Sequence, residues 1–249
     1  MYGLTTVIPF FNYKQVAKKY LDVAVKTVLN WSDTDPEVII VFDKTEENTG
    51  EEDVDKWQGH PNVRIIKRPR PPRGLQVARI LGLREATKEY ACVFDADDSS
   101  FKNFKKLQIE AMEREKAEVC FGCWQDYDSR LVNTEWDESR DHIMPNDIVY
   151  EAVKYACDNH RYSGRLFPYG NVLLCASWII KRKTLLDTGM LDDARMPETG
   201  EGIMHMELDF TYNLVLKTQK AIIHTDQMYL YRTKYKDYYG DENIKWEKT

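Results

Sequence analysis

The stretch that decides the fold is residues 90–100, YACVFDADDSS, in which an apolar run ends in three closely spaced carboxylates, Asp95, Asp97 and Asp98. In an extended segment alternate side chains share a face, so Asp95 and Asp97 are predicted to point the same way at the end of a buried strand. Two hard oxygen ligands on one face suit Mg²⁺ or Mn²⁺ and leave coordination positions for phosphate oxygens. Helix capping by one of residues 98–100 would explain one acidic residue here but not three. The cluster therefore predicts a metal site formed by Asp95, Asp97 and Asp98.

Strands and helices are predicted to alternate along the part of the chain that precedes this acidic stretch. We expect strands at 3–10, 37–43, 63–67 and 90–95, with helices at 13–31 and 74–87. This alternation predicts βαβ units and a parallel sheet, in which ligands bind at the carboxyl ends of the strands. Asp43 and Asp95 both fall at such ends, so we expect the two carboxylates to converge on one crevice.

After residue 100 the rhythm changes. Helices are expected at 101–115, 145–159, 183–188 and 206–218, and strands at 119–124, 172–180 and 220–232. The segment 44–55 is acidic and reads as turns. We expect a nucleotide-binding half at 1–100, a second, acceptor-side half at 101–235 and a polar tail at 236–249.

Composition narrows the class of protein. The chain has 249 residues, a formal net charge of -6 and a sequence pI near 5.5, which argues against a broad polyphosphate-binding face and makes nucleic acid an unexpected partner. The strongest basic cluster is local, in KRPRPPRG, and consists of Lys67, Arg68, Arg70 and Arg73.

Five cysteines without regular spacing fit a reducing compartment, and the lone pair Cys120 and Cys123 reads as buried thiols because zinc would need a second pair. No apolar run reaches membrane-spanning length and no charged leader opens the sequence. We expect a cytoplasmic protein, or one that is peripheral at a membrane.

Five segments, in this order, resemble the family 2 glycosyltransferases. They are TTVIPFFN, EVIIVFDKTEENT, RGLQVARILGLREATKEYACVFDADD, CASWIIKRKTLLDTGMLDD and MELDFTYNL. The resemblance runs from about residue 5 to residue 232. It implies an α/β protein with the GT-A (Rossmann-like) fold, whose mostly parallel central sheet is flanked by helices and followed by an acceptor-side second half.

The activity implied by the resemblance is transfer of one sugar from a nucleotide diphosphate sugar, with UDP the expected nucleotide, to a hydroxyl of a glycan or other acceptor. Mn²⁺ or Mg²⁺ would neutralise the departing diphosphate as a Lewis acid. Of the expected donor-binding residues, Pro9, Asn12, Asp43, Gly74, Arg79 and Asp95 stand where the resemblance places them, and Ala96 lies within the metal motif. Arg73 departs from the family pattern, which commonly has Asn there, but is placed to add positive charge near the diphosphate.

The acceptor hydroxyl must lose a proton as it attacks, and inversion in one displacement needs one general base. The resemblance points to Glu207 for this role. Asp209 lies about 200° further around a helix, so the two carboxylates cannot face the same substrate atom. Glu198 and Glu201, in the segment just before, are alternative bases.

Departures from the family pattern leave other classes open. Phe42 stands where the family usually has an aspartate that contacts the nucleoside, and Glu207 replaces the usual catalytic aspartate. A catalytically inactive sugar-nucleotide-binding protein is one alternative. A nucleotidyltransferase on a similar sheet is the other, although its Gly-rich phosphate loop is missing from the turn PFFNYK that follows the first strand.

Overall fold

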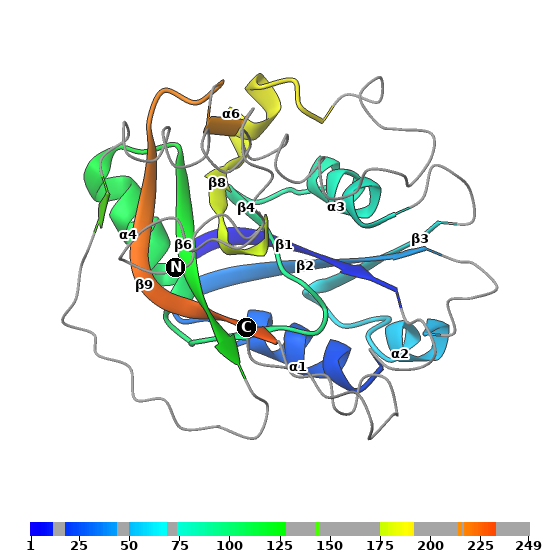
Figure 1. Ribbon diagram of the computed structural model, residues 1–249. Coiled ribbons are helices and arrows are strands. Elements are labelled where there is room, and N and C mark those ends of the chain that lie inside the picture. The colour runs from blue at the N-terminus through cyan, green and yellow to red at the C-terminus, as the bar shows by residue number, and fades with distance from the viewer. Residues whose placement is uncertain are drawn as a thin grey trace.

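The computed structural model describes residues 1–11, 18–43, 50–68, 74–127, 143–144, 175–191, 214–215 and 217–232. In these residues one continuous mixed sheet carries nine strands, eight of them in the order β3-β2-β1-β4-β8-β6-β9-β5, while β7 pairs with β9. Figure 1 shows α1 and α2 on one side of the amino-terminal strands and α3 on the other. The α/β fold with helices on both faces of the sheet is therefore confirmed.

The amino-terminal strands form the parallel half of the sheet. They are β1 (Tyr2–Phe10), β2 (Thr34–Asp43), β3 (Val63–Arg68) and β4 (Tyr90–Val93). The helices between them are α1 (Lys18–Leu29), α2 (Glu51–Asp55) and α3 (Leu75–Arg84). β1 pairs in parallel with β2 on one side and β4 on the other, and its central residues are fully buried. Strands covered on both faces read as near-continuous apolar runs, as the buried parts of β1, β2 and β4 do.

The second half adds antiparallel pairs. Its elements are β5 (Ser99–Ser100), α4 (Phe104–Glu115), β6 (Val119–Tyr127), β7 (Ile143–Met144), η1 (Cys175–Ser177), β8 (Ile179–Lys181), α6 (Arg182–Asp187) and β9 (Ala221–Arg232). The short strand β8 runs antiparallel to both β4 and β6 and so joins the two halves of the sheet. The long strand β9 pairs with β6 in parallel and with β5 antiparallel.

Helix α3 lies very close to the central strands at Gly82. A Cβ atom on Gly82 would lie 2.2 Å from Cγ1 of Val7 and 3.1 Å from Cγ2 of Val41. Because Val7 and Val41 are fully buried in β1 and β2, the absence of a side chain at position 82 sets how near α3 can approach the sheet. This spacing matters because α3 carries residues of the candidate site.

Several predicted boundaries differ from the structure. The strand predicted at 90–95 ends at Val93, and that predicted at 37–43 begins at Thr34, so that Pro36 lies inside β2 rather than before it. The acidic segment read as turns contains helix α2. Where the sequence predicts the end of a strand at 172–180, the structure has the short 3₁₀ helix η1 followed by the strand β8.

Helix capping is not the role of residues 98–100. Ser99 and Ser100 form β5, and α4 begins after Asn103, which occupies the N-cap position without a side-chain capping hydrogen bond. The helices predicted at 145–159 and, for the most part, at 206–218 lie outside the described residues.

Candidate functional site

The candidate site lies at the carboxyl ends of the parallel strands, where the chain order switches direction. From β1 the chain crosses to β2 and β3 on one side and then returns to β4 on the other, and crevices at such switch points bind ligands in open α/β sheets. β4 ends at Val93, which is opposite Val7, whereas β1 continues to Phe10. Pro9 lies in this extension, where its missing N–H leaves no ladder hydrogen bond to β4 unmade.

Asp43 organises the entrance to helix α3. One carboxylate oxygen accepts a hydrogen bond from Nη1 of Arg68 at 3.1 Å, and the other accepts from the backbone N–H of Gly74, also at 3.1 Å. Gly74 has a φ of 116°, a conformation that favours glycine, and so allows the chain to enter α3 directly beside this carboxylate. Asp43 is thus placed at the carboxyl end of β2 as the sequence predicts, already bonded to protein groups.

Arg79 connects the same helix to the acidic residues. Its Nη2 donates to Oδ1 of Asp95 at 2.7 Å, and the Arg79 side chain is only 3% exposed. Gly74 and Arg79 are five residues apart, a rise of about 7.5 Å along a helix. The first turns of α3 therefore contact both Asp43 and Asp95, and the predicted convergence of these carboxylates on one edge of the sheet is explained by the helix between them.

The acidic loop, residues 94–98, differs from the extended segment that the sequence suggested. It turns after β4, and the backbone N–H of Asp98 donates to the carbonyl of Asp95 at 3.2 Å. Asp95 and Asp97 are partly exposed, whereas Asp98 is 1% exposed and Ala96 is 8% exposed. The expectation of an extended strand through Asp97 is therefore wrong, because β4 stops at Val93 and the chain turns at residues 95–98.

These residues fit a divalent cation only in part. Among the described residues, no three carboxylate, imidazole or thiol side chains come close enough to hold a metal ion by themselves. Asp95 and Asp97 are partly exposed carboxylates just beyond the end of β4, so a cation held by them would need further oxygen ligands from solvent or a phosphate group. Mg²⁺ in particular retains such ligands in most protein sites.

Contacts with Trp31 and β9 hold the carboxyl-terminal end of the acidic loop, at Ser99 and Ser100. Trp31, just beyond α1, donates from Nε1 to Oγ of Ser100 at 2.8 Å, and its ring packs edge-on against Phe94 at 5.4 Å between centroids. Ser99 and Ser100 pair with Leu230 and Tyr229 of β9. The loop is therefore held at both ends, by Arg79 at Asp95 and by α1 and β9 at Ser99–Ser100.

One residue at this edge was not singled out from the sequence. Phe11 follows β1 immediately and is 45% exposed, although large aromatic side chains are mostly buried. Its neighbour Phe10 packs against Phe42 at 6.2 Å between ring centroids. An aromatic residue directly after a predicted buried strand is the signal that could have identified it.

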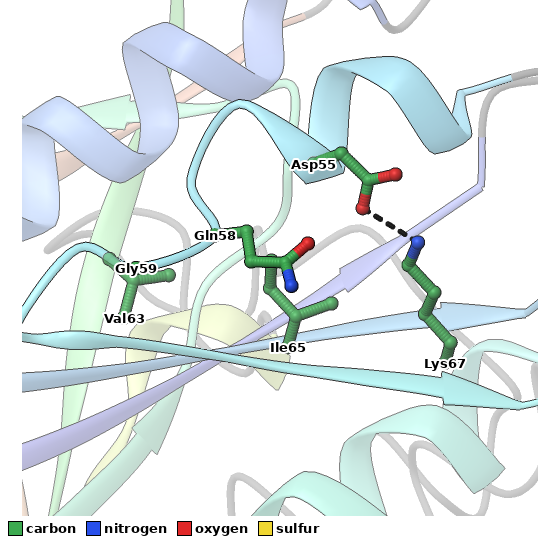
Figure 2. A pocket seen from close by; sticks show the side chains of 6 residues that line it. All are labelled: Asp55, Gln58, Gly59, Val63, Ile65 and Lys67. Carbon is green, nitrogen blue, oxygen red and sulfur yellow. Dashed lines mark ion pairs between the residues drawn. The ribbon is translucent and has the colours of Figure 1, made fainter.

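A pocket of about 410 Å³ lies away from this edge, between α2 and strand β3. It is lined by Asp55, Gln58, Gly59, Val63, Ile65 and Lys67. Figure 2 shows Lys67 reaching across to Asp55, with 2.6 Å between Nζ and Oδ1. Lys67 also pairs with Glu51, so the charge of this member of the predicted basic cluster is neutralised by carboxylates of α2. None of the predicted site residues line the pocket.

Several predicted site residues lie outside the described residues. They are Asn12, Arg73, Glu207 and Asp209, together with the alternative bases Glu198 and Glu201. The structure thus brings together Pro9, Asp43, Gly74, Arg79 and the acidic loop, and the assignment of a general base stays a prediction.

The sequence profile of glycosyl transferase family 2 matches residues 5–184, which include all of these described site residues. The chain belongs to this family. The match begins in β1 and ends in α6, so it spans both the parallel half of the sheet and the crossing to β8.

One curated protein and one solved structure are similar to this glycosyl transferase. "Glycosyltransferase GlyG" of Streptococcus pneumoniae is 22% identical over 233 residues, which cover 93% of this chain and 71% of that protein. The crystal structure of S. aureus TarS 1–349 in complex with UDP-GlcNAc superposes with a TM-score of 0.63 at 16% identity, covering 93% of this chain. The aligned region spans 58% of that TarS chain, and the likeness at this identity establishes the GT-A fold.

A second crystal structure, which contains a longer TarS chain, is also similar to this protein. The structure of S. aureus TarS matches with a TM-score of 0.61 and 17% identity, covering 94% of this chain and 37% of that one. In the described residues of this family member, no helix has the length and apolar character needed to cross a bilayer.

Proposed function

We propose that this protein transfers one sugar from a UDP-sugar to an acceptor hydroxyl, with inversion, and requires a divalent cation. The observation that carries the proposal is the contact of one helix, α3, with both Asp43 and Asp95 at the carboxyl ends of the parallel strands. Family membership supplies the reaction class. That TarS has been crystallised with UDP-GlcNAc and with UDP supports a uridine nucleotide as the donor here.

The nucleoside half of the donor would bind where β1 and β2 end. Phe11 offers a partly exposed aromatic face, and bases stack on such faces with little dependence on their identity. Asp43 offers a carboxylate that can accept a hydrogen bond from the nucleoside. Phe42, which stands where the family usually has an aspartate, cannot accept one. A nucleoside contact at Asp43 would be made beside its hydrogen bonds to Arg68 and Gly74. Recognition of the base would therefore depend on the position in which these two bonds hold the Asp43 carboxylate.

The diphosphate would bind over the acidic loop. Asp95 and Asp97 would hold Mn²⁺ or Mg²⁺, with the remaining coordination positions filled by phosphate oxygens and water, and Asp98, being buried, would orient the loop rather than bind the ion. The cation would stabilise the negative charge that grows on the leaving diphosphate. Arg79, paired with Asp95, keeps that carboxylate in place.

On the acceptor side, Glu207 would take the proton of the attacking hydroxyl. A single carboxylate opposite the leaving group performs one displacement, so the transferred sugar would have the anomeric configuration opposite to that in the donor.

The proposal is tested by a donor screen with Mn²⁺ across UDP, GDP, dTDP and CMP sugars, read by mass spectrometry of the released nucleotide. We expect turnover of a UDP-sugar, its loss in EDTA and its recovery on adding Mn²⁺ or Mg²⁺. Asp97→Ala should lose turnover while keeping the folded circular dichroism spectrum. Asp35→Ala is the matched control, because Asp35 lies at the opposite end of β2 and its side chain is 50% exposed.

Two results would contradict the proposal. Full turnover in EDTA would remove the metal requirement. Release of nucleotide only from donors other than UDP-sugars would leave the family assignment intact and overturn the choice of base.

A further inference from the structure

A lysine lies in the hydrophobic core directly behind the candidate site. Lys105, in the first turn of α4, is fully buried. Its ammonium group lies 4.1 Å from the ring centroid of Phe104 and 5.8 Å from that of Trp31. Burying a charge costs free energy unless it is well compensated, and an apolar side chain of this length would fill the same space without that cost. The position of this ammonium therefore calls for an explanation.

Three neutral oxygens surround the Lys105 ammonium. Nζ donates to Oε1 of Gln108 at 2.9 Å, to the carbonyl of Trp178 at 3.1 Å and to the carbonyl of Ser177 at 3.3 Å. An ammonium has three N–H groups, so donors and acceptors match in number. Gln108 reinforces the contact, because its Nε2 donates to the same Ser177 carbonyl at 2.9 Å. Together Lys105 and Gln108 bind α4 to the turn η1.

The turn η1 lies beside the strand that leads into the acidic loop. The antiparallel pairs Tyr90–Lys181 and Ala91–Ile180 place Ser177 and Trp178 alongside the residues that follow Ala91, where β4 runs toward Asp95. η1 also contacts β4 directly. Trp31, whose ring centroid lies 5.8 Å from the Lys105 ammonium, packs against Phe94 and donates from Nε1 to Ser100. The ammonium is thus near both the segment that lies alongside the end of β4 and the tryptophan that holds the far end of the acidic loop.

Among the described residues, the titratable groups that act on the Lys105 ammonium are the thiols of Cys92 and Cys120. Burial raises the pKa of the Cys92 thiol on β4, and burial raises that of Cys120 on β6 to about 12, so both stay protonated at neutral pH. Burial in turn lowers the pKa of Lys105 to about 8. The loss of one proton would leave an amine with two N–H groups for three acceptors.

We propose that Lys105 is a positioning residue, which as an ammonium clamps η1 against the base of the acidic loop and thereby sets the geometry for sugar transfer. The link to transfer rests on the proposed function, whereas the clamp itself does not. When the ammonium loses its proton, one of the three acceptors loses its donor and η1 loosens, although the fold stays intact.

The clamp is tested first without any substrate. Lys105→Met keeps the length and apolar stem of the side chain and removes the donors. Hydrogen–deuterium exchange at pH 7 should become at least about three- to tenfold faster in peptides covering 175–181, because the three hydrogen bonds from Nζ are lost and even one of them would account for that change. The matched control is Lys106→Met, because Lys106 is the next residue of the same helix and pairs with Asp33 at the surface. Unchanged exchange in Lys105→Met would overturn the clamp.

The link to catalysis is tested with a pH profile of UDP-GlcNAc turnover in Mn²⁺. In the wild type and in Lys106→Met, kcat should fall by about three- to tenfold as the pH rises through 8. Lys105→Met should have the lower kcat already at pH 7 and lack this alkaline fall. An identical alkaline fall in Lys105→Met would refute the role in transfer. If the wild type turns over no sugar nucleotide at all, the proposed function fails, and the exchange experiment still decides the clamp.

Discussion

Replacing Gly82 by alanine should push α3 away from the sheet. The new Cβ would lie 2.2 Å and 2.8 Å from the two methyl carbons of Val7, whereas carbon atoms pack best at about 3.5–4.0 Å. Val7 cannot yield, because β1 is hydrogen-bonded to strands on both sides. The helix would therefore have to retreat by about 1–2 Å, which also lengthens the 2.7 Å contact between Arg79 and Asp95.

Two opposing terms set the size of the effect. Alanine is favoured over glycine inside a helix by about 1 kcal/mol. Overpacking of a rigid core costs typically about 1–3 kcal/mol, and the shortness of this contact places Gly82→Ala at the upper end. We therefore expect a net loss of about 2 kcal/mol in the free energy of unfolding, with a weaker affinity for the donor as α3 shifts Arg79.

The measurement is a double-mutant cycle by urea denaturation. Val7→Ala opens the space that the new methyl group needs, so the double variant Val7→Ala/Gly82→Ala should be less destabilised than the sum of the single variants, with a coupling of about 1–3 kcal/mol. Gly3→Ala is the control on the same strand, because its Cβ would meet no atom closer than 3.6 Å. Strictly additive effects of the two substitutions would refute the reasoning.

Three further results are expected. Asp43→Ala should raise the dissociation constant of UDP by about ten- to a hundredfold in calorimetry, the cost of one charged hydrogen bond, and unchanged affinity would place the base elsewhere. Glu207→Gln should keep donor binding and lower the transfer rate by roughly 10²–10⁴-fold, with an inverted anomer by NMR in the wild type; a retained anomer would move attention to Glu201 or Asp209. The folded state binds fewer protons at Lys105 than the unfolded state between pH 8 and 10.5, so the wild type should gain up to about 3 kcal/mol of unfolding free energy over Lys105→Met in this range, and a flat difference would contradict the burial of charge.

The parallel half of the fold could be predicted because strands that are buried on both faces need apolar residues at nearly every position. β1 and β2 are covered on both faces and read as continuous apolar runs, and the alternation with helices then fixes the sheet. Pro36 suggested a later start for β2, since proline lacks an N–H; the strand nevertheless extends back to Thr34 beside β1. The helix α2 was missed because five acidic and apolar residues are too few to display a helical period.

The roles of the candidate site residues stay predictions, whereas their arrangement is given by the structure. Asp43, Gly74 and Arg79 were expected from the family pattern, and the contacts that relate them are tertiary, so no local pattern in the sequence indicates these contacts. The turn of the acidic loop could not be read locally, because it depends on Trp31 and on a strand far along the chain. Lys105 gave no signal at all, since a lysine in a helix is ordinarily solvated and only packing reveals that this one is not.

The pairing of Ser99 and Ser100 with Leu230 and Tyr229 has a consequence for how the protein is made. About 130 residues separate the partners, and ribosomes add roughly 5–20 residues per second, so the first four strands leave the ribosome about 7–26 seconds before β9 can join them. During that interval the loop carrying Asp95 and Asp97 has one support missing, and its geometry is completed only by the last strand of the sheet. A nascent chain of this protein would thus pair its parallel strands early and complete the surroundings of the acidic loop late.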